Sequence, residues 1–233
     1  MRYFKIALFL AAILAILAPL FIRAEGSYAA APASCGAWSI VKSPNSSFGV
    51  ESLFNGVAVV SSNDVWAVGM SRNQSGFSSH TLTEHWNGSQ WSIISSANPS
   101  SAQNVLVSAA ALTANNIWAV GFTTDMNGFS QTLAEHWNGT TWKLVASPNP
   151  DPMFNGLSSL SAASANNIWA VGIQKVASET LIEHWNGTQW QVVASPNRDG
   201  SSNILQSDAV VPNTSKVWAV GYSGSSTLTE FYC

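Results

Sequence analysis

The chain has 233 residues with 9 basic and 12 acidic side chains, and 46% of its residues are hydrophobic. This weak negative charge disfavours nucleic acid as a partner, because phosphate binding needs clustered Lys and Arg. The length suffices to bury a core, and a charged content of only 9% with many Ser, Thr, Asn and Gly is typical of an all-β extracellular protein.

Residues 1–33 are expected to be an export signal and a short linker. Arg2 and Lys5 precede an apolar run over residues 6–22, which is the pattern of a secretory signal peptide. Small residues follow at Ala31-Pro32-Ala33, and they predict cleavage before Ser34. The run is slightly long for a signal peptide and just too short for a clear membrane span, so a retained membrane anchor is the alternative.

Cleavage would leave 6 basic and 11 acidic side chains and a formal net charge of −5. The predicted location is secreted or extracellular, and a membrane-anchored, extracytoplasmic form is the alternative. Membrane contact is expected only if the N-terminal segment is retained.

The mature chain, residues 34–233, is predicted to be one domain built from repeats. The tetrapeptide Trp-Ala-Val-Gly begins at Trp66, Trp118, Trp169 and Trp218, and a period of about 50 residues indicates an array of structural units. A second motif, Glu-His-Trp-Asn-Gly, keeps the same spacing and begins at Glu84, Glu135 and Glu183.

Each unit is predicted to contain four short strands, which the third repeat places at about residues 156–163, 168–172, 180–185 and 190–193. Asn186-Gly187 between the last two predicts a hairpin turn, because both residues tolerate positive φ angles. Units of this size indicate an all-β fold, a four-bladed β-propeller with four antiparallel strands per blade. The blades are expected at about residues 50–97, 103–148, 155–196 and 203–233, the last with a strand at 37–43.

The two ends of the domain are predicted to share the fourth blade. Residues 36–45 match the end of a unit, as at residues 139–149, whereas residues 228–233 match only as far as the third strand. A strand at 37–43 would therefore act as a clasp that closes the ring and removes exposed sheet edges. Cys35 and Cys233 would then meet in one turn, so a disulfide is predicted. A monomer is expected, and exchange of these strands within a dimer is the alternative.

All 11 tryptophans occupy repeat positions, so they are predicted to pack between neighbouring blades. The Glu-His pairs are the candidate metal-binding or acid-base groups. Adjacent residues on a strand point to opposite faces, so the two members of a pair cannot chelate one ion. A structural role is expected instead: Glu accepts hydrogen bonds near the hairpin and His packs against the adjacent blade. No metal and no cofactor are predicted.

The pairing of Asp-Val-Trp-Ala-Val-Gly at residues 64–69 with His-Trp-Asn-Gly-Thr-x-Trp at residues 136–142 resembles repeats of secreted bacterial β-propeller proteins. Gly-x-x-Trp in the hairpin, as at Gly139 to Trp142, is similar in part to the Asp-box turn of sialidase-like propellers. Photosystem II assembly-factor propellers also carry Trp-Ala-Val-Gly strands. These resemblances imply a propeller fold and leave a sialidase-like glycan hydrolase and a membrane-tethered assembly factor as alternative functions.

No catalytic residues are predicted, and the chain is not expected to be an enzyme. Sialidase-like chemistry uses three arginines, whereas only Arg72 and Arg198 remain in the mature chain. The serines are scattered through turns and include no Gly-x-Ser-x-Gly elbow.

The loops between second and third strands and between blades vary in sequence and are predicted to emerge on one face. Variable loops on a rigid scaffold are where binding sites usually lie. The predicted function is therefore a non-catalytic binding or scaffold module for carbohydrate or extracellular protein. The candidate ligand-binding residues are Arg72, His80, Asp125, Asp151, Phe154, Arg198 and Asp199.

Overall fold

The computed structural model describes residues 36, 38–175, 179–198, 200–212 and 214–233. It divides the chain into two units, residues 1–41 and 42–233. The second unit holds fifteen strands, and the described residues contain no helix, so the all-β prediction is confirmed. No helix long and apolar enough to cross a membrane occurs among these residues, and the predicted export segment lies outside them.

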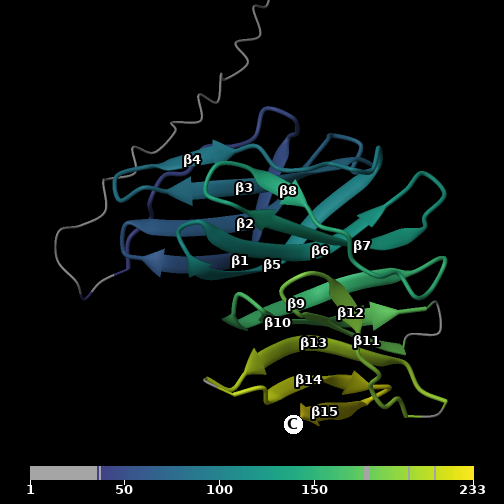
Figure 1. Ribbon diagram of the computed structural model, residues 1–233. Coiled ribbons are helices and arrows are strands. Elements are labelled where there is room, and N and C mark those ends of the chain that lie inside the picture. The colour runs from purple at the N-terminus through teal and green to yellow at the C-terminus, as the bar shows by residue number, and fades with distance from the viewer. Residues whose placement is uncertain (1–35, 37, 176–178, 199, 213) are drawn as a thin grey trace, which may run out of the picture. The chain divides into compact units, whose positions relative to one another are not determined.

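The strands fall into four consecutive groups along the chain (Figure 1). The first group is β1 (Glu51–Ser61), β2 (Asp64–Arg72), β3 (Ser79–Trp86) and β4 (Trp91–Ile94). The second is β5 (Gln103–Thr113), β6 (Asn116–Thr124), β7 (Ser130–Trp137) and β8 (Trp142–Leu144). The third is β9 (Asn155–Ser164), β10 (Asn167–Gln174), β11 (Glu179–Trp185) and β12 (Trp190–Val192). The fourth is β13 (Asn203–Val210), β14 (Val217–Ser223) and β15 (Ser226–Tyr232).

Each group is an antiparallel meander in which sequential strands pair with one another. The first and second groups are joined by one parallel bridge between Ser79 and Gln103. Every Trp-Ala-Val-Gly tetrapeptide lies in the second strand of its group, as the repeat predicted. We refer to the four meanders as sheets 1 to 4.

The glycine that ends each tetrapeptide lies where the first strand of the same sheet bulges toward it. In sheet 2, Gly121 faces Leu106 at a shift in the β5–β6 register. A Cβ atom at Gly121 would overlap the backbone carbonyl oxygen of Val105. The corresponding glycines Gly69, Gly172 and Gly221 face the same obstruction from their own first strands. Only glycine allows the two backbones to approach this closely.

The core lies between the sheets and is built around the repeated tryptophans. Trp66 of β2 packs on Trp137 and Trp142 of sheet 2, with ring centroids 4.7 and 5.4 Å apart. Trp118 packs in the same way on two tryptophans of sheet 3, Trp185 and Trp190, at 4.7 and 5.6 Å. The prediction that these tryptophans pack between blades is confirmed at both interfaces.

Contacts between the sheets run in sequence order, from β1 to β5, from β5 to β9 and from β9 to β13. In the described part of residues 42–233, β13 does not pack back onto β1, and sheet 4 has three strands. Residues 38–50 form no strand, so the strand predicted at residues 37–43 is not seen among the described residues. The sheets form an open stack, and closure of the ring stays a prediction.

The predicted Asn-Gly hairpins are present, but their geometry differs from a two-residue turn. Gly187 has φ of 98°, whereas Asn186 keeps a negative φ. The Asn186 Oδ1 instead accepts hydrogen bonds from the backbone N–H groups of Thr188 and Gln189, at 2.9 and 3.1 Å. The asparagine is therefore needed for its side-chain acceptor.

The predicted disulfide is not described, because Cys35 lies outside the described residues; Cys233 is exposed.

Candidate functional site

The variable loops gather at one end of the stack, which we call the loop end. It consists of the loops between second and third strands and the linkers between sheets, at about residues 73–78, 95–102, 125–129, 145–154, 193–198 and 200–202. Backbone hydrogen bonds join loop to linker: the Ser79 N–H donates to the Ala102 carbonyl and the Ser130 N–H to the Met153 carbonyl, both at 2.9 Å. The predicted placement of these loops on one face is therefore correct.

A buried asparagine holds each linker at the start of the following sheet. In sheet 2, the Asn104 Oδ1 accepts from the Ser100 N–H at 2.9 Å, and its Nδ2 donates to the Ser100 and Ser79 carbonyls. Asn155 and Asn203 bind Asp151 and Arg198 by the same two-way pattern. Each asparagine therefore satisfies backbone groups of a linker from inside the protein.

Two loops share a turn that presents an exposed phenylalanine. Asn73-x-x-Gly76-Phe77 and Asp125-x-x-Gly128-Phe129 both begin with a side-chain oxygen that accepts backbone N–H groups of its own loop. Gly76 and Gly128 have φ of 74° and 87°, which glycine adopts without strain. Phe77 is 79% exposed and Phe129 is 42% exposed. The sequence signal for this pair was an apolar residue after Gly in otherwise polar loops, and it was missed.

A polar part of the loop end lies around Asp125. Its Oδ1 accepts from the N–H groups of Asn127 and Phe129 at 2.8 and 2.9 Å. The Phe129 hydrogen bond is the main reason why the pKa of Asp125 lies below its usual value. Asp125 and Phe129 line a cavity of about 450 Å³, which also takes in Pro99, Ser101 and Thr132. A carboxylate beside an exposed ring suits a ligand with both polar and apolar parts.

Two of the predicted binding residues, Arg72 and His80, lie on the central strands β2 and β3 of sheet 1. The Arg72 Nη1 lies 3.5 Å from the Glu51 Oε2, and both side chains are well exposed. The His80 ring stacks on Phe48 with centroids 3.4 Å apart. His80 therefore has a packing partner, and Arg72 stays accessible to solvent.

The other predicted residues are spread along the linkers. The Asp151 Oδ1 accepts from the N–H groups of Met153 and Phe154, at 2.9 Å each, and so shapes its own linker. Phe154 lines a second cavity of about 430 Å³ with Phe122. Arg198 lines a third cavity of about 400 Å³. Asp199 lies outside the described residues. Asp125, Phe154 and Arg198 thus line three different cavities, and the role of the predicted residues in binding stays a prediction.

The histidines of the Glu-His pairs are fixed within their own sheets. The His136 ring lies 4.5 Å from Trp118, its neighbour across the β6–β7 pair, and its Nε2 lies 2.9 Å from the Asn116 Oδ1. The other two histidines, His85 and His184, make the same contacts with Asp64 and Asn167. The prediction that His packs against the adjacent blade is wrong, because the tryptophan that it covers belongs to the same sheet.

The glutamates make the contacts between sheets instead. Glu135 Oε2 accepts from the Ala97 N–H at 3.1 Å, and Glu183 Oε2 accepts from the Ser147 hydroxyl at 2.5 Å. Both donors lie on the linker from the preceding sheet, and not on the hairpin that the sequence analysis predicted. Burial raises the pKa of both carboxyls to about 7, although these hydrogen bonds oppose the rise.

The remaining two glutamates of the set, Glu84 and Glu230, also have a pKa of about 7 because of burial. Neither Glu84 oxygen has a hydrogen-bond partner among the described residues. No three His, Cys, Asp or Glu side chains in the described ranges lie close enough together to hold a metal ion. Hydrogen bonds are thus seen for Glu135, Glu183 and the three histidines, and not for Glu84.

No family model and no curated protein matches the chain. One solved structure that aligns with it, described as YCF48 bound to D1 peptide, has 14% sequence identity and a TM-score of 0.39. The alignment covers 72% of this chain and 45% of that one, so the chain spans less than half of that structure's length. Membership of the secreted propeller family stays a prediction.

Proposed function

We propose that the protein is an exported, non-catalytic binding or scaffold module whose loop end recognises carbohydrate or an extracellular protein. The observation that carries this proposal is the cavity of about 450 Å³ beside Asp125 and Phe129. It combines an exposed ring with an ionised carboxylate on a loop fixed by its own hydrogen bonds. A prearranged loop loses little conformational entropy when a ligand binds.

The blades supply the scaffold in this proposal. Their repeated Trp, His and Glu side chains are engaged in packing and hydrogen bonds, as described for His136 and Glu183. In the proposed fold each chain contributes four propeller blades, and the strand around residues 37–43 completes the fourth blade beside β15. The free edge of β15 supports this clasp, because an unpaired edge strand is a site for strand addition.

The experiment is a binding screen of the mature protein on a glycan array and against extracellular proteins, followed by loop variants. Asp125→Ala and Phe129→Ser should each weaken the binding found by roughly tenfold or more. Gln189→Ala is the matched control, because it changes an exposed side chain in a hairpin at the opposite end of sheet 3. Binding that all three variants leave unchanged, or turnover of a glycoside panel, would contradict the proposal.

A further inference from the structure

The outer faces of the stack carry side chains that are buried at every interface inside it. Phe54 of β1 is 45% exposed, whereas the leucines at its position in the other sheets are buried: Leu106, Leu157 and Leu205. At the other end, Trp218 and Val220 of β14 are 49% and 44% exposed, although Trp and Val are buried in the other three tetrapeptides. We call these surfaces the Phe54 face and the Trp218 face.

The two faces match each other. Inside the stack, the face with the tetrapeptide tryptophan always packs on the leucine-bearing face of the next sheet: Trp66 and Val68 with Leu106, and Trp118 and Val120 with Leu157. The Trp218 face carries the tetrapeptide tryptophan of sheet 4, and the Phe54 face has Phe54 at the leucine position of sheet 1. The Phe54 face of a second copy can therefore cover the Trp218 face of the first, in the way that neighbouring sheets cover each other inside the stack. This is a head-to-tail arrangement.

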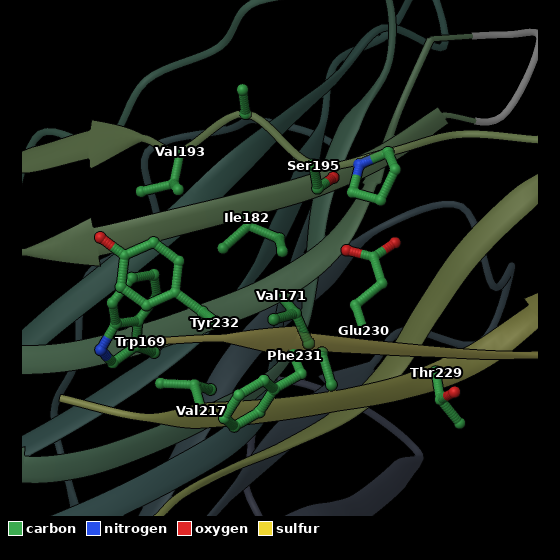
Figure 2. Close-up of a pocket in the computed structure, with 13 residues that line it drawn as sticks. Trp169, Val171, Ile182, Val193, Ser195, Val217, Thr229, Glu230, Phe231 and Tyr232 are labelled. Atoms are coloured by element: carbon green, nitrogen blue, oxygen red, sulfur yellow. The ribbon is translucent and has the colours of Figure 1, made fainter. Parts of the chain in front are cut away.

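A cavity lies beside β15, where the described residues provide no fourth strand for sheet 4. It measures about 240 Å³ and is lined by Trp169, Val171, Val217 and Tyr232 among others. Figure 2 shows the Tyr232 ring beside Trp169 and the Glu230 carboxylate directed toward the segment with Ser195. At the other two interfaces, a fourth-strand tryptophan packs edge-on against the tetrapeptide tryptophan. Trp38 has that position in the repeat, and it is fully exposed.

The residues after Trp38 match those that bind each linker to the sheets in the other repeats. We call these hydrogen-bonding residues anchors. In sheets 1, 2 and 3, a threonine N–H on the third strand donates to an asparagine of the following linker at 2.8 Å: Thr81 to Asn98, Thr132 to Asn149 and Thr180 to Asn197. The matching pair for sheet 4 is Thr227, which is exposed, and Asn45. Ser43 aligns with Ser147, which donates to Glu183, and the acceptor that corresponds is the unpartnered Glu84.

Of these two pairs, Asn45 and Thr227 would join different copies. Residues next to Asn45 are held on sheet 1: the Val50 N–H donates to the Arg72 carbonyl at 3.0 Å, and the Ser46 N–H donates to the Ser52 hydroxyl at 3.2 Å. Sheet 4 is three sheet spacings away at the other end of the stack, or roughly 30 Å at about 10 Å per spacing. Asn45 cannot bridge that distance within its own chain.

We propose that two copies form one closed ring, in which residues 38–45 of each complete sheet 4 of the other. Each Trp218 face then lies on the partner's Phe54 face, so both end faces are buried by two identical contacts. Two copies give eight blades, within the range of about four to eight that propellers adopt. The inference extends the clasp of the proposed function. Its test measures assembly and not ligand binding, so the two proposals fail separately.

The first experiment is the mass of the mature protein by native mass spectrometry and by light scattering after size exclusion. The expected result is twice the mass of one chain. Trp218→Arg should raise the dissociation constant of the dimer at least about 30-fold. Leu144→Asp is the control, because this residue is exposed on β8 and lies on neither end face. A single-chain mass for the unmodified protein, or open polymers, would overturn the proposal.

A second measurement needs no variant. Isotope-labelled and unlabelled chains are mixed, refolded under oxidising conditions and digested without reduction. Exchange predicts that about half of the peptides joined through Cys35 and Cys233 pair a labelled with an unlabelled chain. Joined peptides that always come from chains of one label would show that each chain closes on itself, and would overturn the proposal.

Discussion

Replacement of Glu183 by Gln tests the buried glutamates through the pH dependence of stability. Glu183 is fully buried, and its Oε1 has no partner among the described residues. Its carboxyl loses its proton near pH 4.5 in the unfolded chain and near pH 7 in the folded protein. The folded state therefore binds more protons between these values, and the free energy of unfolding falls as the pH rises, by about 1.4 kcal/mol per pH unit.

The rise of the Glu183 pKa from 4.5 to about 7 corresponds to a loss of about 3 kcal/mol once the pH exceeds 7. Glu183→Gln stays neutral, so its urea unfolding curves between pH 5 and pH 8 should lack this part of the decline. Glu179→Gln is the control on the same strand, because Glu179 is partly exposed and pairs with Lys175. Equal pH slopes for Glu183→Gln and the unmodified protein would refute the reasoning.

Three further substitutions test the packing by urea unfolding. Trp118→Ala should lower the free energy of unfolding by about 3–5 kcal/mol, because it empties a buried interface between sheets. Leu144→Ala, at an exposed position, should lower it by less than about 1 kcal/mol. Similar losses for the two variants would contradict the inter-sheet role of Trp118. Gly121→Ala should cost about 1–3 kcal/mol through overlap with the opposing carbonyl, and Gly156→Ala, which has room for a Cβ atom, should be nearly neutral. His136→Phe should cost about 1 kcal/mol through its lost hydrogen bond, and a loss as large as that of Trp118→Ala would count against this account.

The repeat predicted the strand order and the inter-sheet tryptophans, because both follow from a period that recurs in the sequence. It did not predict which neighbour each polar side chain meets. Alternation along a strand places Glu135 and His136 on opposite faces, but it does not say which face is turned toward the preceding sheet. The structure answers this through the Glu135 bond to Ala97 and the contact between His136 and Trp118.

The loop end was predicted in outline and missed in detail. Strand connectivity placed the variable loops on one face, which the loop-to-linker hydrogen bonds confirm. The shared turn that exposes Phe77 and Phe129 depends on a positive φ at Gly76 and Gly128. A glycine in a polar loop does not reveal its φ angle from sequence alone, so the turn that exposes both rings is seen only in the structure.

Hydrogen exchange of β15 tests the proposed clasp most directly. If residues 38–45 pair with the free edge of this strand, the amides of Glu230 to Tyr232 should exchange as slowly as those of Glu183 to Trp185, the part of β11 that has a strand on both sides. Amides along that edge that exchange as fast as those of an exposed turn would show that β15 is unpaired in solution, and would contradict the account.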